Sequence, residues 1–80
     1  MKQAEVLAKL QEVFDGIFLE KIAAIPELSA ADVDEWDSLM QISLVIAVEQ
    51  KFRVRFRVGE VEAARNLGEF ADLIAKRMEP

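Results

Sequence analysis

Apolar residues recur at helical spacing near the start of the chain. In residues 2–19 they fall on one side of a helical wheel, at Val6, Leu7, Leu10, Val13, Phe14, Ile17 and Phe18. This spacing predicts an amphipathic helix whose two phenylalanines belong to a core. Pro26 disfavours a helical conformation just before it, so we expect residues 20–37 to form a long ordered connection. A one-turn helix at residues 29–32, capped by Ser29, is expected within it.

Residues 38–52 predict a second helix that is apolar on more than one side. The side predicted to face the core consists of Leu44, Val45, Val48 and Phe52. A second apolar stripe consists of Leu39, Ile42 and Ile46, and Met40 with Ala47 forms a third. A single core face cannot cover so much apolar surface. Either this helix is central in the bundle, or one stripe contacts a partner or a ligand.

The segment 51–58 alternates basic and apolar residues, a strand-like pattern that finds no second strand pattern to pair with. We therefore expect an extended loop that turns Phe52, Val54, Phe56 and Val58 inward and the basic residues outward. The basic residues form either a solvated loop face or a patch for phosphate or nucleic acid. Residues 59–65 predict a short third helix. Asn66 and Glu69 match a capping box at the start of a fourth helix, which extends to about Arg77.

Composition limits the chemistry that the chain can perform by itself. Its 80 residues, 52% of them hydrophobic and without a linker-like tract, predict one domain over residues 1–80. Cysteine, histidine, threonine and tyrosine are absent, so the side-chain hydroxyls are those of Ser29, Ser38 and Ser43. A nucleophilic serine needs an adjacent base, and the usual one is missing. We therefore expect no enzyme, and a borrowed reactive group if the chain takes part in acyl chemistry.

The formal net charge of -5 is unevenly distributed. Residues 1–38 carry nine acidic and three basic side chains, and residues 39–80 carry six acidic and seven basic ones. The acidic first part argues against general nucleic-acid binding and suits basic partner surfaces. No segment is similar to a signal peptide or reaches the length of a membrane span, so we expect a cytoplasmic protein.

An acidic cluster, consisting of Asp32, Asp34, Glu35 and Asp37, surrounds Trp36. It is either a metal or partner site, or a solvated loop with Trp36 packed against the core. We expect no metal, because the ligand register and the glycine turn of a cation-binding loop are missing.

Ser38 stands where this loop meets the second predicted helix. Asp37 or Ser38 can accept a hydrogen bond from a free backbone N–H of the first turn. A phosphate attached to Ser38 would lie where free N–H groups and the helix dipole favour an anion. The alternative is that Ser38 is an ordinary N-cap.

The order of these elements, with Asp37-Ser38-Leu39 at the start of the second helix, resembles the acyl carrier protein family. The resemblance covers nearly the whole chain and also rests on Trp36, residues 46–49 closing on Phe52, Val61 and residues 66–70. It implies an all-α four-helix bundle with a short third helix. It also implies that a phosphopantetheinyl transferase attaches 4′-phosphopantetheine from coenzyme A to Ser38. The monomeric carrier would then hold acyl groups as thioesters and serve acyl-loading and acyl-transfer enzymes.

The resemblance also assigns roles around Ser38, where Asp37 would contact the transferase or its metal and Leu39 would lie beside the arm. Family members in general fatty-acid synthesis carry several acidic residues along the second helix, but here Glu49 alone is acidic in its body. We therefore expect a specialised carrier, in lipid or secondary-metabolite synthesis, that relies more on apolar contacts. The expected partner-binding residues are Trp36, Met40, Ile42, Ser43, Ile46, Arg53, Arg55 and Arg57.

Two alternatives remain open at this point. One is a stand-alone aminoacyl or peptidyl carrier, which shares the arm chemistry. The other is a helical interaction module that binds a protein or a nucleic acid through the second helix and the basic loop, with Ser38 as a mere cap.

Overall fold

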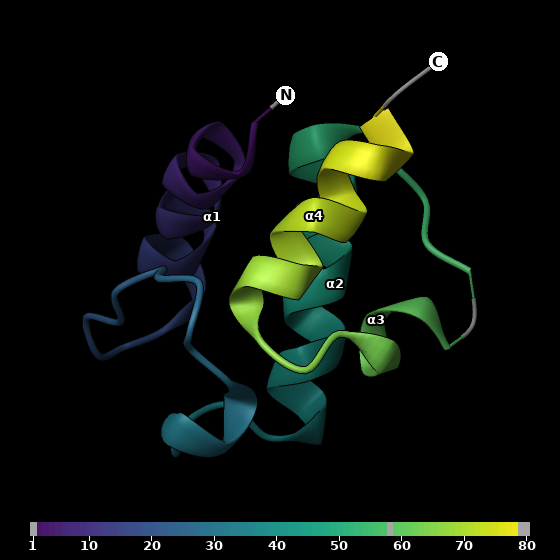
Figure 1. The fold of residues 1–80 in the computed structure, drawn as a ribbon. Helices are drawn as coiled ribbons and strands as arrows, with labels where there is room; N and C mark the ends of the chain where they lie inside the picture. Colours follow the sequence, from purple (N-terminus) through teal and green to yellow (C-terminus); the bar gives the residue numbers. More distant parts are fainter. Residues whose placement is uncertain (1, 58, 79–80) are drawn as a thin grey trace.

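The computed structural model describes residues 2–57 and 59–78, and all the regular secondary structure in these ranges is helical. Helix α1 is Gln3–Ile17, a 3₁₀ turn follows at Ala30–Asp32, and the later helices are α2 (Ser38–Phe52), α3 (Glu60–Ala63) and α4 (Leu67–Met78). No strand occurs in the two described ranges (Figure 1). The predicted all-α fold, with four helices of which the third is short, is confirmed.

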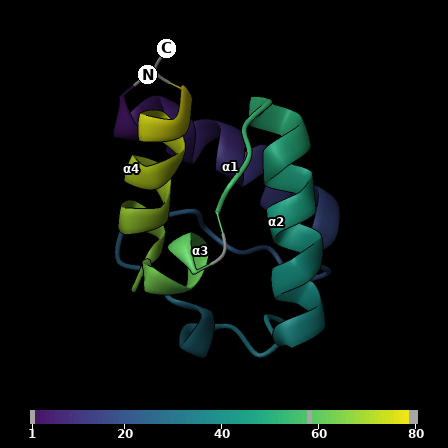
Figure 2. The same cartoon turned by 90° about the vertical axis from the view of Figure 1, so that its right-hand side faces the viewer.

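Helix α1 is the element on which the other long helices pack, because it contacts both α2 and α4, while α3 contacts α4. Figures 1 and 2 show α2 starting beside the 3₁₀ turn at one end of the bundle. It runs to the opposite end, where α1 begins and α4 ends. The first turn of α2, with Ser38, therefore lies at the loop-rich end of the molecule.

The core consists of apolar side chains from every helix and from the connections. Helix α1 contributes Val6, Leu10, Val13 and Phe14; α2 contributes Leu44, Val48 and Phe52; and α4 contributes Leu67, Phe70, Ala71 and Ile74. Phe18, Val33, Val54 and Val61 complete it from the remaining segments. Because these positions recur every three or four residues, each long helix turns one stripe inward. The core side predicted for α2 is confirmed, with Val45 partly buried against it.

Helix α1 ends at Ile17, two residues before the predicted end. Phe18 leaves the helical conformation (φ -91°, ψ 139°) and is buried. Its ring packs edge-on against Phe14, with ring centroids 5.1 Å apart. Burying this ring competes with a further helical turn, and Gly16 just before it has a low helix propensity.

Polar side chains order the long connection between α1 and α2. The Gln11 amide donates to the carbonyl of Ile22 and accepts from the backbone N–H of Ala24, both at 2.8 Å. The Glu35 carboxylate accepts from the backbone N–H groups of residues 19 and 20, at 3.0 and 2.8 Å. These bonds fix backbone groups of a segment without regular structure, and the predicted ordered connection is confirmed.

The same connection also docks on the start of α4. The carbonyl of Leu28 accepts from the N–H of Leu67 at 2.7 Å, and the carbonyl of Pro26 accepts from the N–H of Gly68 at 2.9 Å. The first N–H groups of a helix have no partner within the helix, so the loop carbonyls satisfy two of them. The connection is thereby attached to α4 near the 3₁₀ turn.

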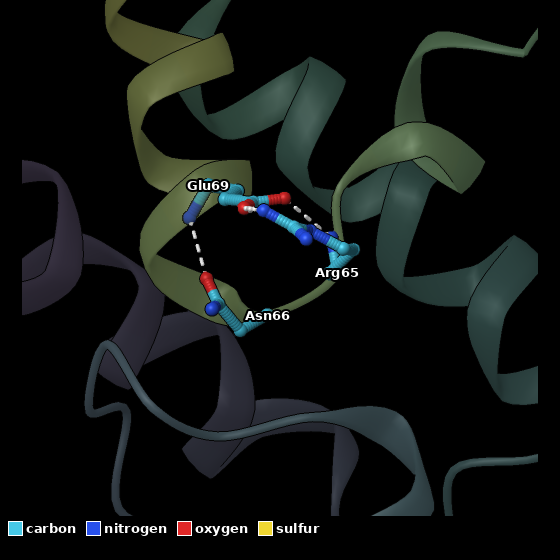
Figure 3. Close-up of polar contacts among 3 residues, drawn as sticks. All are labelled: Arg65, Asn66 and Glu69. Carbon is cyan, nitrogen blue, oxygen red and sulfur yellow. Dashed lines mark hydrogen bonds and ion pairs between the residues drawn. The ribbon is translucent and has the colours of Figure 1, made fainter.

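Two predicted caps differ in detail from the structure. Ser29 occupies the N-cap position of the 3₁₀ turn, but its backbone N–H and its hydroxyl both donate to the carboxylate of Asp32, at 3.1 Å. Asn66 Oδ1 accepts from the N–H of Glu69 at 2.9 Å, as a cap should. The Glu69 carboxylate turns to Arg65 instead of closing the capping box (Figure 3).

The Glu69 carboxylate does not close the capping box because Arg65 offers it more hydrogen-bond donors. Its backbone N–H and its guanidinium donate to the Glu69 carboxylate at 2.7 and 2.9 Å. Arg65 thus offers the carboxylate three donors, two of them on a charged guanidinium, whereas a capping box would offer the single backbone N–H of Asn66. The guanidinium bond lowers the pKa of Glu69, and it raises the pKa of Arg65.

The segment after α2 is the extended loop that the sequence predicted. Arg53 ends α2 in the left-handed conformation (φ 57°, ψ 48°). Val54 is buried, and the half-buried ring of Phe56 packs 5.7 Å from that of Phe70, centroid to centroid. Val58, also predicted to face inward, lies outside the described residues.

Candidate functional site

Ser38 is the first residue of α2, and Asp37 is its N-cap. Asp37 has an extended backbone (φ -95°, ψ -171°), and its Oδ1 accepts from the N–H of Met40 at 2.9 Å. The interpretation of Ser38 as an ordinary N-cap is therefore wrong, because Asp37 occupies that position. The Ser38 side chain is exposed, and its hydroxyl has no hydrogen-bond partner among residues 2–57 and 59–78.

Trp36 holds the loop just before this serine. Its ring packs against those of Phe14 and Phe18, with centroids 5.7 and 5.8 Å apart. Its indole Nε1–H donates to Oε1 of Gln41 at 2.6 Å, which ties the loop to the second turn of α2. Trp36 is thus half-buried against the core, as one of the two interpretations expected. The loop-to-helix junction is fixed on both sides of Ser38.

The second apolar stripe of α2 faces away from the core. Leu39 is 76% exposed, Ile42 58% and Ile46 50%, and Ser43 is exposed among them. Ile42, Ser43 and Ile46 follow Leu39 by three, four and seven positions, so the four residues lie on one face of the helix. Met40 is half-buried and packs against the core. Helix α2 is therefore not central in the bundle, and one stripe is left for contacts outside the fold.

Exposed arginines follow at the carboxyl end of α2. Arg53, Arg55 and Arg57 are all exposed, and none of their guanidinium groups forms an ion pair within the described part of the chain. Two neighbouring charges are engaged elsewhere. Lys51 pairs with Glu12 of α1 at 3.0 Å, and the Glu49 carboxylate accepts from the N–H of Phe56 at 3.0 Å. The net result is a basic loop whose charge is available to another molecule.

A partly open cleft lies near the first two turns of α2. Its lining comes from five segments of the chain and consists of Leu28, Ser29, Ala30, Trp36, Gln41, Val61, Ala64, Arg65, Asn66, Leu67 and Phe70. Sequence reasoning did not find this cleft, because no spacing rule connects residues from five segments. Gln41, one helical turn after Ser38, brings the cleft close to the candidate site.

An ion pair holds α3, which forms part of the cleft wall, against α4. The guanidinium of Arg77 donates to both carboxylate oxygens of Glu60, and the backbone N–H of Arg57 donates to one of them at 2.6 Å. The bond from Arg77, followed by that from the Arg57 N–H, lowers the pKa of Glu60. The ion pair therefore contributes to the fold only while Glu60 is ionised.

The acidic cluster gives no sign of a metal centre. Glu35 is engaged by backbone N–H groups and Asp37 by the α2 cap, while Asp34 is exposed. Over the described ranges, no three acidic side chains converge on a point where a cation could bind. Similarly, none of the helices described combines the length and apolar character needed to cross a membrane.

Comparison with known proteins places the chain among curated sequences of one kind. It is 32% identical over 76 residues to a protein of Acidothermus cellulolyticus named acyl carrier protein. The matched region spans 94% of this chain and 90% of the relative. It is 28% identical over 79 residues to a protein of the same name from Thermosynechococcus vestitus, covering 98% of each. No protein-family model matches the chain. No solved structure matches it significantly.

Proposed function

The chain belongs to the acyl carrier protein family, and from this premise we propose that it carries acyl intermediates as thioesters on a 4′-phosphopantetheine arm attached to Ser38. Membership of this family makes the chain a carrier that performs no catalysis of its own. The family in general carries a phosphopantetheine prosthetic group. The attachment residue, the cargo and the partners are the parts that we propose.

The observation that carries the proposal is the unengaged hydroxyl of Ser38 at a fixed helix start. Because Asp37 caps α2, a bulky group on Ser38 displaces no hydrogen bond of the fold. Trp36 and Gln41 hold the junction in place, so an enzyme meets the serine in one arrangement. Of the other two serines, Ser43 lies in the body of α2 and Ser29 is bonded to Asp32.

The residues around Ser38 also fit the phosphate of the arm. Ser38 would contribute the ester oxygen, which bonds to the phosphorus next to the pantetheine of coenzyme A. The pyrophosphate bond of coenzyme A would break, adenosine 3′,5′-bisphosphate would leave, and the hydroxyl proton would pass to the transferase. The backbone N–H groups of Ser38 and Leu39 have no partner among the described residues and lie at the positive end of the α2 dipole. Asp37 uses Oδ1 for the cap, which leaves its second oxygen for the transferase or its metal. When bound, the arm supplies the thiol that this cysteine-free chain lacks.

We further propose that the carrier serves a specialised pathway of lipid or secondary-metabolite synthesis in the cytoplasm. The support is the surface of α2, which presents Leu39, Ile42 and Ile46 to solvent and ends at a basic loop. Acyl-loading and acyl-transfer enzymes are its proposed partners.

Intact mass spectrometry tests the attachment. The purified chain is incubated with coenzyme A and a phosphopantetheinyl transferase, and its mass should rise by one phosphopantetheinyl group. Ser38→Ala should abolish the gain, whereas Ser43→Ala and Ser29→Ala should retain it. These two controls remove hydroxyls from the same helix and from the preceding connection.

A mass that never changes would instead favour the interaction module, for which the exposed apolar stripe is the supporting observation. A gain in mass that persists in Ser38→Ala would show that the arm is attached to another residue. Either result would contradict the proposal as it stands.

A further inference from the structure

Ser38 stands in line with a series of residues that runs along α2 to its carboxyl end. The residues four, eight, eleven and fifteen positions after Ser38 are Ile42, Ile46, Glu49 and Arg53. Positions with this spacing lie on one face of a helix. The two isoleucines are 58% and 50% exposed. A straight and partly apolar path therefore leads from the proposed attachment residue to the start of the basic loop.

This path ends in an open groove with a net positive charge. The lining of the groove consists of Ile46, Glu49, Gln50, Arg53, Val54 and Arg55. Arg53 and Arg55 are exposed, and neither forms an ion pair within the described part of the chain. Glu49 is half-buried, and its carboxylate already accepts a hydrogen bond from the backbone N–H of Phe56. An anion in the groove therefore meets two exposed guanidinium groups, which a carboxylate satisfies well.

The distance from Ser38 to this groove matches the length of the proposed arm. Along the helix axis, Ile46 lies about 12 Å and Arg53 about 22 Å from Ser38, at about 1.5 Å per residue. From the serine oxygen to its sulfur, an extended phosphopantetheine arm spans roughly 17 Å, at about 1.2 Å per bond of an extended chain. Its sulfur can therefore reach a level between Ile46 and Arg53. A short acyl group adds about 5–7 Å beyond the sulfur, which brings its far end to Arg53.

The chemistry of the two hollows on this side of the molecule separates charged from neutral cargo. An apolar end gains no hydrogen bond in the arginine-lined groove, whereas the cleft near Trp36 offers it apolar walls. A carboxylate in that cleft would lose its water without compensation. The basic residue of the cleft lining, Arg65, is already bonded to Glu69 at 2.9 Å. The groove is therefore the place for an anionic end.

We propose that the carrier takes short acyl groups that end in a second carboxylate, with the arm lying along the exposed stripe of α2 and that carboxylate bound to Arg53 and Arg55. This inference rests on the proposed function, and it adds the chemical class of the cargo and the residues that recognise it. The methyl and methylene groups of the arm cover Ile42 and Ile46, which removes apolar surface from water. The charge-assisted bonds to the guanidinium groups hold the far end of the cargo.

Nuclear magnetic resonance of the loaded carrier tests where the cargo lies. A phosphopantetheinyl transferase loads the chain from coenzyme A, from glutaryl-coenzyme A or from pentanoyl-coenzyme A, and intact mass verifies each attachment. The two acyl groups have equal numbers of carbons, but only glutaryl ends in a carboxylate. Relative to the arm alone, glutaryl should shift the backbone amide signals of Gln50 and Arg55 in the groove, and pentanoyl should not. Glutaryl should leave the signals of Ala64 and Leu67, which line the cleft, in place.

The terminal carboxyl of the glutaryl group, labelled with a carbon isotope, provides a second measurement. At about 0.05 M NaCl its pKa should lie about 0.5 below that of free glutaryl-pantetheine, because nearby positive charges favour the ionised form. This difference should shrink at about 0.5 M NaCl, because salt screens exposed charges.

Three variants assign the effect to the groove. Arg55→Gln and Arg53→Asn should each remove about half of the pKa difference, since each removes one of the two facing charges. Asparagine suits position 53 because its backbone is left-handed. Arg57→Gln is the matched control, because it removes the same charge from an exposed arginine of the same loop that does not line the groove. It should keep most of the difference. All three side chains are exposed, so the variants should fold, and thermal unfolding verifies this.

Several outcomes would overturn the inference. A cargo carboxyl with the pKa of the free compound would show that no guanidinium faces it, and an equal loss in Arg57→Gln and Arg55→Gln would remove the assignment to the groove. Shifts at Ala64 and Leu67 with glutaryl would place the carboxylate in the cleft instead. In each of these cases the gain in mass would leave the proposed function intact. If the unchanged chain never gained the arm, the proposed function itself would fail, and this inference with it.

Discussion

Replacing Asp37 by alanine removes the side-chain cap of α2 and leaves Ser38 in place. The lost contact is the 2.9 Å hydrogen bond from the N–H of Met40 to Asp37 Oδ1. Replacing Ser38 by alanine removes a hydroxyl with no partner in the described part of the chain. The two neighbouring substitutions should therefore separate stability from modification.

The expected sizes follow from these contacts. Loss of an N-cap typically costs about 1 kcal/mol. Loss of a negative charge at a helix start costs roughly 0.3–1 kcal/mol more at an exposed site. Asp37→Ala should thus destabilise the fold by about 1–2 kcal/mol, or about 4–8 °C in Tm for each kcal/mol in a domain of this size. Ser38→Ala should change stability by less than about 0.5 kcal/mol, because alanine is at least as good a helix former as serine.

Urea unfolding, followed by circular dichroism and by the fluorescence of Trp36, measures both variants against the unchanged chain. Asp37→Asn is the control, since asparagine also caps helices, and it should recover at least half of the lost stability. A Ser38→Ala variant less stable than Asp37→Ala would refute this reasoning. It would show that the serine hydroxyl supports the fold.

Two further pairs of variants test other contacts. A Cβ on Gly68 would lie 3.1 Å from the Cβ of Pro26 and 3.2 Å from its carbonyl oxygen, whereas a Cβ on Gly16 would meet nothing within 4 Å. Thermal unfolding should therefore show Gly68→Ala destabilised by about 1 kcal/mol from crowding and Gly16→Ala stabilised by about 0.5–1 kcal/mol; equal effects would contradict the docking of the connection on α4. The lowered pKa of Glu60 means that the stability from its contact with Arg77 is complete above the carboxyl's unfolded pKa and is lost as pH falls through the lower folded value. The Tm difference between the unchanged chain and Glu60→Gln should accordingly shrink from about pH 6 to about pH 3, and a constant difference would refute the assignment.

The sequence predicted local elements well where one strong signal dominated. The bounds of α2 follow from Asp37 and Ser38 before an apolar run, and the cap at Asn66 follows from its spacing to Glu69. It predicted less well where two local groups compete. Nothing in the order of residues 65–69 shows that the Glu69 carboxylate prefers Arg65 to a capping box, because that choice depends on the rotamers of both side chains.

By itself, the sequence determined the helical periodicity, the absence of any thiol or imidazole, and the serine at the start of α2. It therefore indicated the fold class and the residue to which an arm would attach. The sequence also predicted the core side of α2. Only the tertiary structure decided that the second stripe, Leu39, Ile42 and Ile46, stays exposed, because that depends on whether another element packs over it. It also assigned the cap to Asp37 and left the Ser38 hydroxyl without a partner, because a hydrogen bond depends on the positions of atoms as well as on their order in the chain.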